Sequence, residues 1–89
     1  TSKDPAYLMG QMELRESIED AEHAADPFAE LDRLYKIVRQ RKREVEDDFS
    51  LAYEQQNFDV AKQAVLKMRF CERIISEIKR IEERIDDDF

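Results

Sequence analysis

The side chains with the most distinctive chemistry are Leu8, Met9 and Met12, three apolar residues near the start of the chain. At about 100° per residue in a helix they fall on one side, which we call the Met/Leu patch. The opposite side carries a second apolar stripe: Tyr7, Leu14, Ile18, Ala21 and Ala25. The patch is rimmed by charged residues: Glu13, Arg15, Glu16 and Asp20. An adaptable apolar patch with a charged rim is typical of a surface that recognises another protein.

Side chains that often do covalent or acid–base chemistry lack the partners that such chemistry needs. Cys71 falls on an apolar stripe, which predicts a buried thiol, and His23 has no Ser, Cys or fixed carboxylate pattern around it. Glu13 and Glu16 are neighbours, but no nucleophile or base accompanies them. We therefore predict a binding module and not an enzyme, with no cofactor and no metal site.

Composition limits the class of protein further. The 89 residues carry a formal net charge of -7, which disfavours nucleic acid and anionic membranes as ligands, and no apolar run is long enough to span a bilayer. A basic run over residues 39–43 is followed at once by acidic residues, so it reads as a solvated helix face. A single cysteine cannot form an internal disulfide, which favours a reducing compartment.

Three helices are predicted, near residues 5–24, 27–55 and 58–86. Asp4-Pro5 and Asp26-Pro27 each offer an acidic N-cap followed by proline at the first helical position, and Asn57 offers a third N-cap. With one glycine and two prolines, the chain has few other residues that favour turns.

Apolar spacing predicts how these helices pack. The second follows a heptad pattern: Phe28, Leu31, Tyr35, Val38, Lys42, Val45, Phe49 and Ala52. The third supplies an antiparallel partner: Val60, Ala64, Cys71, Ile74, Ile78, Ile81 and Ile85, with a flank of Leu66, Met68, Phe70 and Ile75. Gly10 is either a point of close approach or a tolerated flaw. The prediction is an all-α three-helix bundle, one domain over residues 1–89, in which a short first helix packs on a long antiparallel hairpin.

Three segments resemble the C-terminal domain of the HscB family, the J-type co-chaperones of iron–sulfur cluster assembly: residues 7–16, residues 66–70 and the terminal Asp87-Asp88-Phe89. The resemblance covers essentially the whole chain. It implies a three-helix bundle that binds the cluster-scaffold protein, called IscU in bacteria, and delivers it to the chaperone HscA. The family's J-domain is expected to precede this segment, and a chain that starts at Thr1 fits an excised piece. His23 is followed by Ala24, so the His-Pro-Asp tripeptide of J-domains does not occur here.

The resemblance also implies which residues contact the scaffold: Leu8, Met9, Met12, Glu13, Arg15, Glu16 and Phe70. This chain departs from the family pattern at Gly10, where an acid is common, and at Met12, where leucine is common. The second change conserves volume and is expected to cost little. Apolar contacts would supply affinity, and the charged residues would set register and partner choice.

The sequence leaves open one other interpretation of the patch and one of the whole chain. The Met/Leu patch also fits the place where a missing N-terminal domain packs. The chain as a whole also fits a structural bundle or coiled-coil segment that mediates domain packing or dimerisation.

Phe70 sits at the edge of the predicted core, so its side chain belongs either to the core or to the rim of the partner-binding surface. The resemblance implies the bacterial cytoplasm, or the mitochondrial matrix in a eukaryote.

Overall fold

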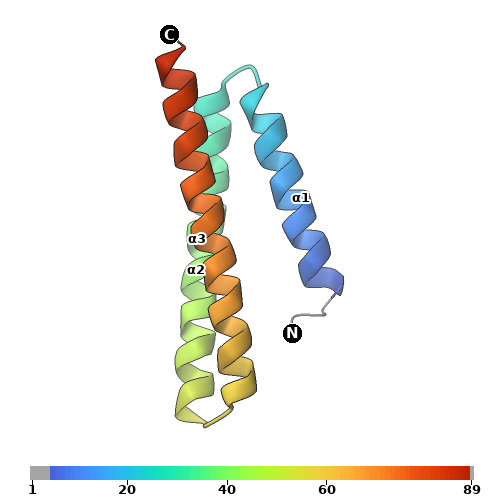
Figure 1. The fold of residues 1–89 in the computed structure, drawn as a ribbon, viewed down its shortest axis with the longest axis vertical. Helices are drawn as coiled ribbons and strands as arrows, with labels where there is room; N and C mark the ends of the chain where they lie inside the picture. The colour runs from blue at the N-terminus through green and yellow to red at the C-terminus, as the bar shows by residue number, and fades with distance from the viewer. Residues whose placement is uncertain (1–4, 89) are drawn as a thin grey trace.

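Three helices make up the fold, which a computed structural model describes for residues 5–88, with side chains from residue 7 onward. They are α1 (Pro5–Glu22), α2 (Pro27–Glu54) and α3 (Phe58–Asp87). Helices α2 and α3 form a long antiparallel hairpin, and the shorter α1 packs beside it, so that the hairpin turn projects beyond the start of α1 (Figure 1). The predicted all-α three-helix bundle is confirmed, and each predicted helix boundary lies within two residues of the observed one.

The helix ends follow from local capping. Asp26 accepts a hydrogen bond from the backbone N–H of Ala29 at 3.2 Å, and Pro27 begins α2, as the Asp-Pro pair predicts. Asn57 caps α3 in the same way, accepting from the Val60 N–H at 3.4 Å. Both caps position the short connections that bring the three helices together.

The turn between α2 and α3 closes without glycine. Gln56 adopts φ 59°, a left-handed conformation that costs a residue with a β-carbon about 1 kcal/mol. The N–H of Asn57 donates to the carbonyl of Ala52 at 2.8 Å, and the N–H of Gln56 donates to the carbonyl of Tyr53 at 3.0 Å. These are the two hydrogen bonds of a Schellman motif, and they satisfy carbonyls that the end of α2 would otherwise leave unpaired.

A single apolar cluster from all three helices forms the main core: Ile18, Ala21, Leu31, Leu34, Val38, Phe70, Cys71, Ile74, Ile78 and Ile81. No charged side chain is buried within the part of the chain that the structure describes. Lys42, the one polar member of the predicted heptad, keeps its ammonium near the surface, 3.9 Å from a Glu72 carboxylate oxygen on α3. The seam of the hairpin is therefore apolar at its centre and joined by an ion pair at its margin.

The predicted core is wrong at four positions, one of which is Leu66 on the flank of α3, 42% exposed. Val60 is 42% exposed, and its neighbour Ala61 is buried instead. Phe28 lies at the surface near the start of α2, while Leu34, absent from the predicted heptad, is buried. Ala25 is exposed and lies beyond the end of α1. For Val60 and Phe28 the cause is rotational, because an α-helix drifts by about 20° per heptad against a strict 3.5-residue repeat.

Gly10 is a flaw in α1 and not a point of close approach, because a β-carbon added there would meet no atom within 4 Å. Replacing glycine by alanine in a helix removes backbone freedom from the unfolded chain. We therefore expect Gly10→Ala to stabilise the fold by about 0.5–1 kcal/mol and to raise Tm by about 4 °C in thermal unfolding followed by circular dichroism. Glu19→Ala, at an exposed site of the same helix, serves as the control. A lower Tm for Gly10→Ala would contradict this account.

Candidate partner-binding surface

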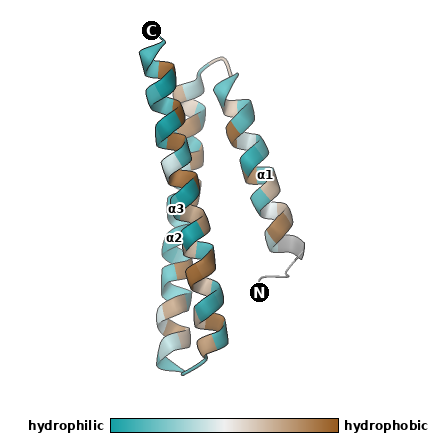
Figure 2. Cartoon of the chain, in the orientation of Figure 1, coloured by the Kyte–Doolittle hydropathy of each residue, from teal (hydrophilic) through white to brown (hydrophobic). Residues whose placement is uncertain are grey.

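The Met/Leu patch is exposed along the first half of α1. Leu8 is 45% exposed, Met9 62% and Met12 63%, whereas Ile18 and Ala21 of the same helix are buried against the hairpin. Figure 2 shows hydrophobic positions near the start of α1 as well as along the seam of α2 and α3. The prediction that α1 has one core face and one exposed apolar face is thus confirmed.

An aromatic and cationic cluster joins the start of α1 to the hairpin. The rings of Tyr7 and Phe70 meet edge to face with centroids 6.3 Å apart. The Arg15 guanidinium carbon lies 5.7 Å from the centroid of the Phe70 ring, and the Lys67 ammonium lies 5.2 Å from that of Tyr7. These geometries fit cation–π contacts, which hold both cations over the rings.

Phe70 belongs to the core. Its side chain is only 2% exposed, so in this structure it offers no surface to a partner, contrary to its place among the expected contact residues. Tyr7 and Arg15 cover it. A helical wheel places Phe70 at the edge of the apolar arc of α3, and only the packing of α1 decides that this edge is buried.

The charged rim of the patch is available for intermolecular pairing. Glu13, Arg15 and Glu16 are exposed, and none of them forms an ion pair with another residue that the structure describes. Exposed charges of this kind contribute little to the stability of the domain. At a protein interface they steer association and fix register.

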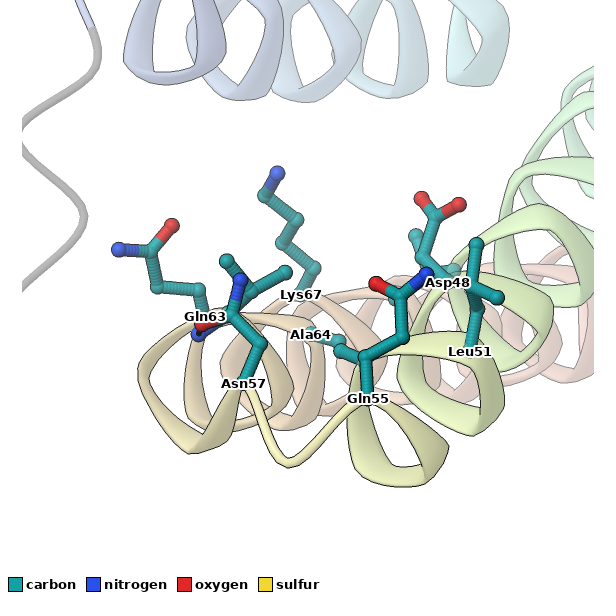
Figure 3. A pocket seen from close by; sticks show the side chains of 10 residues that line it. Asp48, Leu51, Gln55, Asn57, Gln63, Ala64 and Lys67 are labelled. Atoms are coloured by element: carbon teal, nitrogen blue, oxygen red, sulfur yellow. Dashed lines mark hydrogen bonds between the residues drawn. The ribbon is translucent and has the colours of Figure 1, made fainter.

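A second exposed apolar surface lies at the hairpin end, by which we mean residues 51–60. Leu51, Tyr53 and Phe58 are each more than half exposed, and the ring of Tyr53 lies 5.9 Å from that of Phe58. Leu51 also lines a groove of about 180 Å³, walled by side chains from both helices (Figure 3). This surface is not among those predicted from the sequence. The sequence does contain an indication of it, because residues 51–66 include only three charged residues in a chain that is 42% charged.

Comparison with known proteins decides the family. A family profile described as the HSCB C-terminal oligomerisation domain matches residues 3–79. The chain belongs to the HscB family, as its C-terminal domain. It is 34% identical to the co-chaperone protein HscB homolog of Shewanella baltica strain OS185, over 98% of this chain and 52% of that protein. Co-chaperone protein HscB of Proteus mirabilis is 31% identical, over 100% of this chain and 51% of its own length.

A solved structure agrees with the sequence relatives. Chaperone HscB from Vibrio cholerae superimposes with a TM-score of 0.85 at 30% identity, over 94% of this chain and 52% of that one. The chain thus spans about half the length of the HscB relatives that it matches. The family resemblance carried by residues 7–16 and 66–70 is confirmed.

The described part of this HscB domain brings together no group of three His, Cys, Asp or Glu side chains suited to a metal ion. None of its helices is long and apolar enough to cross a membrane. His23 lies exposed in the turn after α1.

Burial raises the pKa of the Cys71 thiol above its ordinary value, although the nearby charges of Arg41 and Lys42 partly oppose this effect. In the unfolded chain the thiol ionises near pH 8.5, whereas in the folded chain it stays neutral to higher pH. Cys71 therefore contributes stability that is complete below the unfolded pKa and is lost as the pH rises through the folded pKa.

We expect the free energy of unfolding to fall more between about pH 7 and pH 10 in the wild type than in Cys71→Ala. Urea titrations at both pH values measure the difference, and the loss in Cys71→Ala gives the part of the pH dependence that does not come from the thiol. Equal losses in the two proteins would show that Cys71 ionises as readily in the folded as in the unfolded chain.

Proposed function

We propose that this HscB domain binds an iron–sulfur cluster scaffold protein of the IscU type. The observation that carries the proposal is the exposed Met/Leu patch on α1, in the segment where the chain resembles the family's scaffold-binding surface. The rim of Glu13, Arg15 and Glu16 supports it, because an apolar centre surrounded by polar and charged residues is the usual composition of a protein interface.

Affinity would come from burying the three apolar side chains. Each gives roughly 1.5–3 kcal/mol on full burial, before the costs of association and of ordering the methionines. The rim would choose the register of the partner. Phe70 would support binding indirectly, because its buried ring lies under the Arg15 guanidinium and holds it in place. We assign Phe70 this supporting role and no contact of its own.

In the full-length protein we propose that a J-domain tethered to this bundle presents the bound scaffold to an HscA-type chaperone. Tethering makes the encounter intramolecular and raises the effective concentration of the scaffold. The bundle by itself would bind the scaffold without stimulating ATP hydrolysis by the chaperone, since Ala24 follows His23 and this chain holds no His-Pro-Asp tripeptide. Because the relatives are bacterial, we place this activity in the bacterial cytoplasm rather than the mitochondrial matrix.

Isothermal titration calorimetry of the 89-residue chain with an IscU-type scaffold protein tests the proposal. We expect saturable binding with one scaffold molecule per domain. A folded chain, verified by circular dichroism, that releases no heat with the scaffold would contradict it.

A second candidate function is self-association through the hairpin end. The exposed Tyr53 and Phe58 support it, as does the description of the matching family as an oligomerisation domain. If this surface joins two copies, the wild type should sediment as a dimer at micromolar concentration, and the pair Tyr53→Ser and Phe58→Ser should sediment as a monomer. A wild type that stays monomeric would exclude this candidate.

A further inference from the structure

An open groove of about 750 Å³ runs between α1 and α3, and its lining is rich in arginine. The lining residues are Arg15, Arg69, Glu72, Arg73, Ser76, Glu77 and Arg80. All four arginines are exposed. This concentration of positive charge runs against the composition of the chain, whose formal net charge is -7.

Three of the four guanidinium groups have no described contact inside the domain, and the fourth, that of Arg15, lies over the Phe70 ring. None of them forms an ion pair with another described residue, whereas Arg33 and Arg84 elsewhere in the bundle pair with Glu30 and Glu22. Glu72, which also lines the groove, lies 3.9 Å from the ammonium of Lys42 on α2. A guanidinium presents five donors in a planar fork that matches a carboxylate, so four guanidinium groups without an ion pair in one groove form a surface suited to anion recognition.

The groove is continuous with the Met/Leu patch through Arg15. Leu8, Met12 and Arg15 are spaced four and three residues apart, so they share one face of α1. Arg15 lines the groove beside Arg69, and the Phe70 ring beneath it fixes its position. A partner that covers the patch therefore reaches the groove without a gap.

We propose that this arginine groove docks an acidic segment of the same scaffold partner that covers the Met/Leu patch. The inference rests on the proposed function and adds to it the chemistry of the partner. Along the axis of α3, Arg73 stands about 6 Å and Arg80 about 16 Å beyond Arg69. Aspartates or glutamates at similar intervals on the partner would match this spacing and form ion pairs with the guanidinium groups.

The occupant is a protein segment rather than a nucleic acid. Glu72 and Glu77 interrupt the arginines, and the strongly acidic chain repels a continuous polyanion. Separated carboxylates on a folded partner place negative charge only where an arginine stands. The acids of the groove then add selectivity, because they reject misaligned partners.

The test compares two charge-reversed variants of the 89-residue chain that have the same net charge. Arg73→Glu with Arg80→Glu removes the centre and far end of the groove. Arg43→Glu with Lys62→Glu is the control, because both residues are exposed and neither forms an ion pair among the described residues. Calorimetry with the IscU-type scaffold at low and high ionic strength gives Kd and its salt dependence, and circular dichroism verifies folding.

The groove variant should bind the scaffold at least about tenfold more weakly at low salt, with a smaller salt dependence, while the control stays within about twofold of the wild type. Arg73→Gln with Arg80→Gln should reduce the affinity for the scaffold less than the glutamate variant does but more than the control. Such a loss excludes repulsion by the new glutamates as the only cause. Equal binding by all variants would overturn the proposal that the groove docks an acidic segment, but it would not contradict the proposed function. A wild type that does not bind would overturn both.

A competition arm separates the classes of partner. Single-stranded poly-uridylate RNA is added to the complex of wild type and scaffold. No displacement at low salt supports an acidic protein segment. Displacement that depends on Arg73 and Arg80 would overturn the proposal in favour of a nucleic-acid site.

Discussion

Replacing Leu8, Met9 and Met12 together with alanine is expected to weaken binding to an IscU-type scaffold by at least about a hundredfold, which corresponds to about 3 kcal/mol. All three side chains are 45–63% exposed, so truncation removes much of the surface that a partner would bury. The same exposure means that the bundle loses little packing, and Tm should stay within a few degrees of the wild type. Calorimetric titration and thermal unfolding measure the two quantities.

The hairpin end provides a matched control for this triple variant. Leu51, Tyr53 and Phe58 are exposed to a similar degree, and their joint replacement by alanine removes apolar surface from the hairpin end, which projects beyond the start of α1 (Figure 1). We expect that control to bind the scaffold like the wild type. If instead the α1 variant binds normally but unfolds many degrees lower, the Met/Leu patch is a structural joint, and the alternative of a packing or dimerisation segment gains support.

Ile78→Ala is expected to reduce the free energy of unfolding by about 2–5 kcal/mol. Ile78 is 0% exposed and belongs to the core cluster that all three helices share. A domain of this size has about 4–13 kcal/mol of stability in total, so the loss removes a large share of it. Tm should fall by about 10 °C or more.

Urea unfolding at one pH, followed by circular dichroism, measures this effect. Ile37→Ala makes the same chemical change at a site that is 43% exposed on α2, and it should cost much less, about 1 kcal/mol or under. Equal losses at the two sites would mean that Ile78 does not occupy a tightly packed core.

The chain's local chemistry determined the number, ends and inner faces of the helices. The Asp26-Pro27 pair and Asn57 begin α2 and α3 where the caps predict, because a cap needs only neighbours within three residues. The two-faced character of α1 was also readable, since Met9 and Ile18 differ in face by helical geometry alone. The family resemblance in residues 7–16 and 66–70 is likewise a property of the sequence.

Tertiary structure alone decided what lies at the margins of the packed faces. Phe70 is buried and Val60 is exposed because the rotation of α3, and the extent to which α1 covers it, depend on how three helices fit together. The arginine groove has the same origin in part. Helical spacing alone places Arg69, Arg73 and Arg80 on one face of α3, whereas Arg15 is far from them in the chain and joins that surface only because α1 packs beside α3.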